Sequence, residues 1–235
     1  MPQHIGIVAC SAEGASLCYR TLCVEGAHHF GPHAHPEVTM HTYSLAEYMN
    51  CIYRGDWQGV GELMLSSAEK LAKTGADFLI CPDNTIHRAL PRIEARSPLP
   101  WLHIAEVVAA QAVEQGFRRL GLTGTRWLVD SEVYPDKLTA CGLEVIRPTV
   151  AERDEIDRII MDELVYGLFK PEAIASFQRA FGRMKDAGCD AVILGCTEIP
   201  LIVNDSNSPL PILDSTRLLA RAALRRAVRS APASA

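Results

Sequence analysis

Short apolar runs alternate along the chain with longer stretches in which apolar residues recur at helical spacing. The short runs are rich in β-branched residues, which is typical of buried strands. They lie at 5–9, 38–42, 78–81, 101–104, 120–123, 143–146, 191–194 and 212–213. The longer, amphipathic stretches predict helices at 60–72, 105–114, 155–168, 172–187 and 218–228. Strands that alternate with helices of this length indicate βαβ units, so the predicted fold class is α/β with parallel sheets flanked by helices.

The two halves of the chain resemble each other. The matching segments are 75–87 with 188–200, 98–103 with 209–214, and 5–10 with 120–125, at offsets of 113, 111 and 115 residues. Any two βαβ units share some features, but the second match includes the same Pro-Leu-Pro triplet in both halves. Three matches in the same order at nearly one offset predict two similar, pseudo-symmetric α/β domains.

The repeat also predicts where the domains divide and where a ligand binds. We expect a first domain of residues 1–103 plus 215–235 and a second of residues 104–214, with the helix at 218–228 packing back on the first half. Ligands bind at the carboxyl ends of parallel strands. The repeat aligns Asp83 with Cys196, each just after a buried strand. An active site in the cleft between the domains would then have an acid on one side of a ligand and a base on the other.

The composition and charge of the chain limit the kinds of molecule that it is expected to bind. The chain has 235 residues, of which 48% are hydrophobic, and its net charge is −5. No long basic run is present, which argues against nucleic-acid binding. No window of 18 uncharged apolar residues predicts a membrane span, and the N-terminus lacks a signal-peptide pattern, so we expect a cytoplasmic protein. Only residues 230–235 have a composition that predicts disorder.

Cysteine and histidine give no metal signature. None of the eight cysteines forms a Cys-x-x-Cys pair, so zinc-ribbon and thioredoxin-like sites are not indicated. We expect most of the thiols to be small apolar core residues. A histidine cluster at 28, 29, 33, 35 and 41 has irregular spacing. We interpret it as a surface loop and expect no metal.

Two segments carry a family resemblance, Pro-Asp-Asn-Thr-Ile-His at 82–87 and Leu-Gly-Cys-Thr-Glu-Ile-Pro at 194–200, supported by Gly-Leu-Thr-Gly-Thr at 121–125. With these motifs the chain resembles the aspartate/glutamate racemase superfamily, which works without pyridoxal phosphate or another cofactor. The similarity extends over nearly the whole chain. In that family one catalytic group removes the substrate α-proton and another returns a proton to the opposite face.

The resemblance implies roles for individual residues. Cys196 matches the second catalytic cysteine, whereas Asp83 stands where the family usually has the first, which predicts an asymmetric Asp83/Cys196 acid–base pair. The positions expected to bind the substrate α-carboxylate are Cys10, Ser11, Asn84, Thr85, Thr125 and Thr197. Glu198 and His87 are expected to support the site. Helix N-termini after these strands would favour an anion and the Cys196 thiolate.

Several of these residues have a second interpretation. Asp83 could simply cap a helix, and its carboxylate is a weak base at the reference pKa unless burial beside another anion raises that pKa. Glu198 could orient Cys196 or be a first-turn carboxylate favoured by the helix dipole. His87 could support the site or lie exposed on a helix. Cys81 is expected to be a core thiol.

The predicted function is a pyridoxal-phosphate-independent amino-acid racemase, an isomerase. Alternatives are a decarboxylase, an isomerase or a hydantoin racemase of the same superfamily, or an inactive carboxylate-binding homologue. An anionic Asp83 would repel a departing carboxylate, which disfavours decarboxylation. The expected ligand is a small molecule, an amino acid or a related carboxylate, and not aspartate in particular. Met49 and Tyr166 stand near positions where acidic-substrate members have cations, with Arg54 and Lys170 nearby. Family members are often homodimers, and we expect one here.

Overall fold

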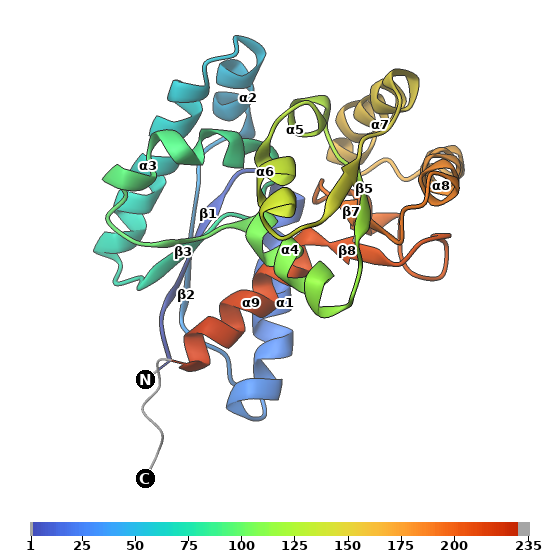
Figure 1. Cartoon of the computed structure of the whole chain (residues 1–235). Helices are drawn as coiled ribbons and strands as arrows, with labels where there is room; N and C mark the ends of the chain where they lie inside the picture. The colour runs from blue at the N-terminus through green and yellow to red at the C-terminus, as the bar shows by residue number, and fades with distance from the viewer. Residues whose placement is uncertain (1, 230–235) are drawn as a thin grey trace. The chain divides into compact units, whose positions relative to one another are not determined.

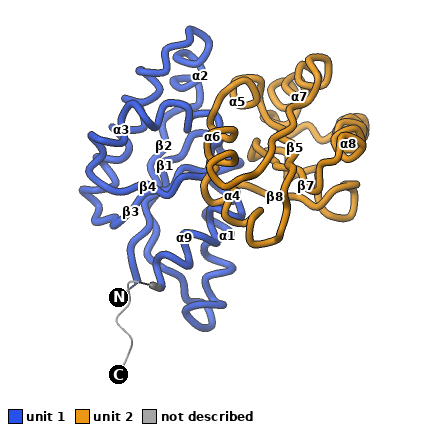
Figure 2. Tube along the Cα trace, in the orientation of Figure 1, with its two compact units in different colours: residues 1–104, 216–235 blue, residues 105–215 orange. Residues whose placement is uncertain are grey.

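The computed structural model describes residues 2–229, so the predicted disorder at 230–235 lies outside the described residues. The chain divides into two compact units, residues 1–104 with 216–235 and residues 105–215 (Figure 2). Within residues 2–229, no helix combines the length and apolar character that crossing a membrane requires.

The first unit is a parallel sheet with helices on both faces. Its strands are β1 (Ile5–Ala9), β2 (Val38–Thr42), β3 (Phe78–Ile80) and β4 (Trp101–Leu102). Its helices are α1 (Ala12–Phe30), α2 (Leu45–Tyr53), α3 (Trp57–Lys73), the 3₁₀ helices η1 (Thr85–Arg92) and η2 (Glu94–Arg96), and α9 (Ser215–Arg229). All five residues of β1 are buried, as expected for a parallel strand covered on both faces.

The second unit repeats this plan. Its strands are β5 (Arg119–Thr123), β6 (Glu144–Ile146), β7 (Ala191–Leu194) and β8 (Ile212–Asp214). Its helices are α4 (Ile104–Glu114), α5 (Arg126–Val129), α6 (Val133–Ala140), α7 (Val150–Asp162), α8 (Pro171–Asp186), and the 3₁₀ helices η3 (Leu164–Tyr166) and η4 (Ile199–Leu201).

Both sheets have the same strand order. The orders are β2-β1-β3-β4 and β6-β5-β7-β8, and every pairing is parallel. In each unit the first and third strands in chain order are therefore neighbours at the centre of the sheet. The predicted fold class is confirmed, and the internal similarity of the sequence corresponds to a repeated topology.

Helices cover both faces of each sheet. In the first unit α2 and α3 lie on one side, and α1 and α9 on the other (Figure 1). The Arg221 guanidinium of α9 contacts the Glu25 carboxylate of α1 at 2.7 Å, and Gln3 donates a backbone hydrogen bond to Ala227, so the C-terminal helix packs on the first unit. In the second unit α7 and α8 cover one face (Figure 1), where Phe177 and Phe181 join the apolar core over β7.

The structure corrects the predicted helix at 155–168. Its N-terminus is at Val150, where Thr149 and Glu152 form a capping box. The α-helix ends at Asp162, since the next residue, Glu163, has a non-helical backbone conformation (φ −125°, ψ −65°); the 3₁₀ helix η3 follows and ends at Gly167, which is left-handed (φ 70°). The pattern also missed the helices α1, α2, α5 and α6.

Candidate active site

The predicted residues of the first unit gather at the carboxyl edge of its sheet. Cys10 and Ser11 directly follow β1, whereas Asp83, Asn84 and Thr85 follow its neighbour β3. All but Asp83, which is half-buried, are buried. Ser11 also caps α1, since its hydroxyl accepts from the Gly14 backbone N–H at 3.2 Å. The turn after each central strand therefore presents its polar groups at one edge.

Asp83 does act as a cap. Its Oδ1 accepts a hydrogen bond from the Ile86 backbone N–H at 3.0 Å, at the start of η1. A carboxylate has a second oxygen, so this bond is compatible with proton transfer. The cap fixes the position of the carboxyl group. It does not decide whether Asp83 is a helix cap alone or also a catalytic acid and base.

His87 is hydrogen-bonded to the backbone of the turn that contains Asp83. It is 1% exposed, so the alternative of an exposed helix position is wrong. Its Nε2 accepts from the Ile104 backbone N–H at 3.4 Å, which leaves the proton on Nδ1 to be donated to the Asp83 carbonyl at 2.7 Å. The ring thus ties the backbone of this turn to Ile104, the last residue of this segment of the first unit.

Cys81 is the core thiol that the sequence predicts. It is fully buried. Burial, followed by the nearby charge of Asp83, raises the pKa of the Cys81 thiol well above its ordinary value. The thiol is therefore neutral and a poor base.

The predicted residues of the second unit occupy the equivalent edge. Thr125 follows β5, and Cys196, Thr197 and Glu198 follow its neighbour β7. All four are buried. The Thr125 hydroxyl caps α5 by accepting from the Leu128 backbone N–H at 3.3 Å.

The Glu198 side chain is hydrogen-bonded to the side chains of the two residues before it. Its Oε2 accepts from the Cys196 thiol at 2.9 Å and from the Thr197 hydroxyl at 2.9 Å. The side chain is 3% exposed, so these bonds are shielded from water. Of the two interpretations of Glu198, the structure supports direct contact with Cys196.

The helix expected after Cys196 is only a short 3₁₀ helix in the described residues. Only the three-residue η4 follows before the polar segment 204–207, where the Asn204 backbone N–H donates to Asn207 Oδ1 and the Ser206 N–H donates to Asn204 Oδ1. Side chains of this type compete with the backbone and favour turns over helices. Stabilisation of a Cys196 thiolate by a helix N-terminus is therefore not provided.

Glycine is required in the turn that carries Cys196. A Cβ on Gly195 would lie 2.4 Å from the Thr123 carbonyl oxygen and 2.7 Å from Leu128 Cδ2. The facing residue Gly124 has a φ of 153°, and a Cβ there would lie 2.9 Å from the Gly195 carbonyl oxygen. The two central strands of this sheet can end so near each other only without side chains at these positions.

Replacing Gly195 by alanine should destabilise the protein by about 1–3 kcal/mol, because a backbone oxygen cannot move aside as a side chain can. Gly182 in α8 is the matched control: a Cβ there meets no atom within 4 Å, so Gly182→Ala should stabilise by about 0.5–1 kcal/mol. Urea unfolding curves of both variants test this. Equal stability of Gly195→Ala and the wild type would contradict the close contact.

An ion pair between exposed Arg126 and buried Asp157, which the sequence analysis missed, fixes the turn after β5. Asp157 of α7 is 4% exposed, and its oxygens accept from the Arg126 backbone N–H at 2.9 Å and the Arg126 Nε at 2.8 Å. The available signal was an aspartate flanked by the buried isoleucines of α7. Because Arg126 directly follows Thr125, this pair positions a predicted substrate-binding residue.

Lys170 and Arg54, the cations that could bind the side chain of an acidic substrate, differ in their surroundings. Lys170 Nζ lies 3.2 Å from Glu163 Oε1, and Arg158 contacts the same carboxylate at 2.7 Å. Arg54 is exposed at the end of α2, and Tyr166 is 74% exposed. The Lys170 charge is therefore already balanced within its own unit.

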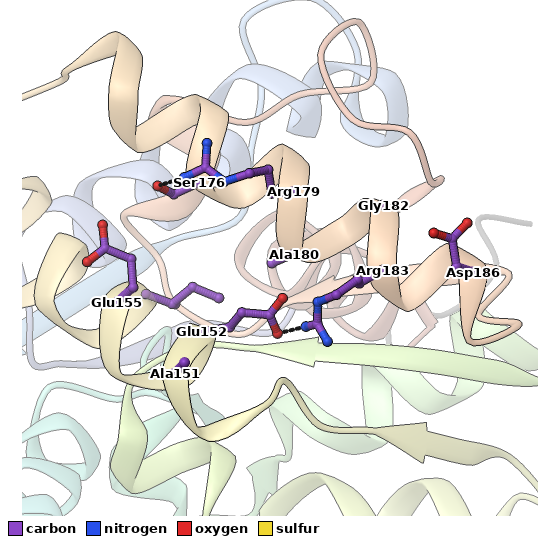
Figure 3. A pocket seen from close by; sticks show the side chains of 10 residues that line it. Ala151, Glu152, Glu155, Ser176, Arg179, Ala180, Gly182, Arg183 and Asp186 are labelled. Atoms are coloured by element: carbon purple, nitrogen blue, oxygen red, sulfur yellow. Dashed lines mark hydrogen bonds and ion pairs between the residues drawn. The ribbon is translucent and has the colours of Figure 1, made fainter.

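A surface pocket of about 530 Å³ lies between α7 and α8, away from the predicted residues. Its lining includes Glu152 and Arg183, which form an ion pair, and Arg179, which donates to the Ser176 hydroxyl at 2.9 Å (Figure 3). The charges of Glu152 and Arg183 offset each other, and the pocket contains none of the residues predicted from the sequence.

The histidine cluster is spread over different elements. His28 and His29 end α1, and His41 lies in β2, so the interpretation as one surface loop is wrong for these residues. Among residues 2–229, no group of three or more His, Cys, Asp or Glu side chains is placed to hold a metal ion.

Comparison with known proteins agrees with this architecture. Residues 5–223 match the Asp/Glu/hydantoin racemase family. The chain is 25% identical over 169 residues to the broad specificity amino-acid racemase RacX of Bacillus subtilis (strain 168), over 71% of each chain. The crystal structure of a candidate Asp/Glu racemase from Yersinia pestis has a TM-score of 0.88 at 31% identity, over 96% of this chain and 99% of that one.

A further crystal structure, of an aspartate racemase homologue from Pyrococcus horikoshii OT3, has a TM-score of 0.82 at 25% identity, over 97% of this chain and 99% of that one. The resemblance inferred from the motifs is therefore confirmed. Because the family match covers nearly the whole sequence and the fold matches these structures end to end, the chain belongs to the Asp/Glu/hydantoin racemase family.

Proposed function

We propose that this protein is an amino-acid racemase that works without pyridoxal phosphate and uses Asp83 and Cys196 as its acid–base pair. The observation that carries the proposal is the equivalence of the two residues. Each follows the third strand of its unit, at the carboxyl edge of a sheet with the same strand order. Relatives of the chain are amino-acid racemases, which are isomerases.

Racemisation requires two catalytic groups, one deprotonated so that it can remove the α-proton and one protonated so that it can return a proton to the opposite face. In one direction the Cys196 thiolate removes the α-proton and the Asp83 carboxylic acid protonates the opposite face; in the other direction the roles reverse. Because Glu198 Oε2 accepts from the Cys196 thiol, we propose that this carboxylate takes the thiol proton and so prepares the thiolate. His87 supports Asp83 through its backbone.

The α-proton of an amino acid is a weak acid, so the charge that develops on the α-carboxylate needs stabilisation. We propose that hydroxyl, thiol, amide and backbone N–H groups at the two sheet edges provide it. These groups belong to Cys10, Ser11, Asn84, Thr85, Thr125 and Thr197. Since Lys170 is neutralised by Glu163, we propose a substrate range that is not confined to acidic amino acids.

Proton NMR in D₂O with single enantiomers tests the proposal. The panel contains both enantiomers of aspartate, glutamate, alanine, methionine and lysine, and the optical rotation is followed in parallel. We expect loss of the α-proton signal together with loss of rotation for at least one amino acid. Exchange with retained rotation would indicate a one-base site, and no exchange with any member would contradict the proposal.

Two further expectations concern the location of the protein and its oligomeric state. We propose a cytoplasmic homodimer, by analogy with the family. Light scattering during size-exclusion chromatography measures the mass of the assembly, and a mass of one chain would contradict the dimer.

A further inference from the structure

The pocket between α7 and α8 belongs to the second unit and takes no part in the proposed acid–base chemistry (Figure 3). Its volume of about 530 Å³ is typical of a site for a small organic molecule. Ile156 of α7 and Ala180 of α8, both buried, contribute apolar surface to its lining. The charged side chains of the lining come from the same two helices, and they differ in how their charges are satisfied.

Two carboxylates of the lining, both from α7, are held by arginines. Glu155 accepts two hydrogen bonds from the Arg158 guanidinium, each at 2.9 Å. These bonds, more than the neighbouring charge of Arg179, lower the pKa of Glu155. Glu152 forms an ion pair with Arg183 and also closes the capping box of α7. The charges of both carboxylates are therefore largely offset within the protein.

Two other charges of the lining, both on α8, are not balanced in this way. The exposed Arg179 guanidinium donates to the Ser176 hydroxyl at 2.9 Å, and no carboxylate among residues 2–229 forms an ion pair with it. The exposed Asp186 carboxylate likewise has no ion-pair partner in that part of the chain. The pocket therefore offers one unbalanced positive charge and one unbalanced negative charge.

These two charges lie on one face of α8 but far apart along it. Residues seven positions apart on an α-helix differ by only about 20° in direction, and the rise of 1.5 Å per residue separates them by about 10 Å. Since the Arg179 guanidinium reaches back to Ser176, the charges can be up to about 15 Å apart. Figure 3 shows Arg179 and Asp186 on either side of Arg183.

A ligand that matches this lining has an anionic end and a cationic end about 10–15 Å apart. The anionic end pairs with Arg179. The cationic end pairs with Asp186, the last residue of α8, where the helix dipole also favours a cation. Between them, the Glu152–Arg183 pair has no net charge but can still accept and donate hydrogen bonds, so it suits uncharged amide groups.

We propose that the pocket between α7 and α8 binds a short peptide of three or four residues with both termini free. An extended chain spans at most about 3.3–3.6 Å per residue, so three or four residues cover about 10–14 Å. The peptide carboxylate contacts Arg179 and its ammonium group contacts Asp186. A single amino acid is too short to reach both, and an internal segment of a protein has no terminal charges. The inference does not rest on the proposed racemase.

Isothermal titration calorimetry of the full chain with trialanine and tetra-alanine tests the proposal, at peptide concentrations up to about 10 mM. We expect at least one of the two peptides to bind. N-acetyl-trialanine lacks the ammonium group, and trialanine amide lacks the carboxylate. Because each loses one charge-assisted contact, each should bind about tenfold more weakly than trialanine.

Two variants assign the two ends of the peptide. Arg179→Gln should weaken the binding of trialanine about tenfold and leave that of trialanine amide unchanged, because the amide has no carboxylate for the arginine. Asp186→Asn should weaken trialanine by the same factor and leave N-acetyl-trialanine unchanged. Both side chains are exposed, so urea unfolding should show the stability of the wild type.

Lys185→Gln and Glu172→Gln are the matched controls. They remove one positive and one negative charge from exposed positions of α8 that are outside the lining of the pocket. We expect both variants to bind trialanine as the wild type does.

Absence of binding by both trialanine and tetra-alanine would overturn the proposal. So would blocked peptides that bind as well as the free ones, or Arg179→Gln and Asp186→Asn variants that bind no more weakly than the two controls. Binding that is lost in Cys196→Ala and kept in the α8 variants would place the peptide at the catalytic edge and overturn the proposal as well. None of these measurements needs turnover, so the result is independent of the racemase proposal.

Discussion

Racemisation should fall by about 10³-fold or more when Cys196 is replaced by alanine. The variant loses the group that removes the α-proton from one enantiomer and protonates the other. Cys196 and its acceptor Glu198 are both buried, so water cannot readily substitute for the thiol. The rate is measured by optical rotation, and α-proton exchange is measured by NMR in D₂O for each enantiomer separately.

Cys189→Ala is the matched control. Cys189 precedes β7 and Cys196 follows it, so the two thiols stand at opposite ends of the same strand. The Cys189 thiol is also buried, and burial raises its pKa. We expect this variant to keep its activity and to lose about 1 kcal/mol of stability. Undiminished racemisation by Cys196→Ala would contradict the proposed mechanism.

Glu198→Gln extends the same test to the partner of Cys196. Glutamine keeps an oxygen that can accept the hydrogen bonds from Cys196 and Thr197, but it cannot serve as the base that takes the thiol proton. If Glu198 removes the thiol proton, the rise of activity with pH moves to higher pH in the variant. A move to lower pH would mean that the Glu198 charge opposes the thiolate and that its role is to position the thiol.

The strands were predictable because parallel strands buried on both faces appear as continuous apolar runs. All five residues of β1 and all four of β7 are buried. α1 was missed because it contains two glycines and several small residues, which weaken the contrast between its apolar and polar faces. The end of α7 was missed because the apolar pattern continues into the 3₁₀ helix η3, and an apolar pattern does not distinguish that helix from an α-helix.

The predicted site residues follow strands and come from short motifs, which is why local sequence could find them. The bonds that hold them could not be found in this way. Asp157 reaches Arg126 across 31 residues. Contacts of this kind depend on tertiary packing, and one sequence without its fold does not specify them.

Asparagine at position 83 should separate the helix cap from proton transfer. The Asn side chain can still accept from the Ile86 backbone N–H, so we expect stability within about 0.5 kcal/mol of the wild type, whereas Asp83→Ala should lose about 1 kcal/mol. Asparagine cannot accept or return a proton, so racemisation should fall by about 10²–10³-fold. Urea unfolding and optical rotation measure the two effects independently.

The two site variants should fail on opposite enantiomers. In Asp83→Asn, Cys196 can still exchange the α-proton that faces it, so one enantiomer exchanges with retained rotation while the other does not. In Cys196→Ala, any remaining exchange belongs to the other enantiomer and is slow, because a carboxylate is a weak base. The same enantiomer surviving in both variants would contradict a two-base mechanism. Racemisation by Asp83→Asn at the wild-type rate would reduce Asp83 to a cap, and activity gained only in Asp83→Cys would indicate a carboxylate-binding homologue.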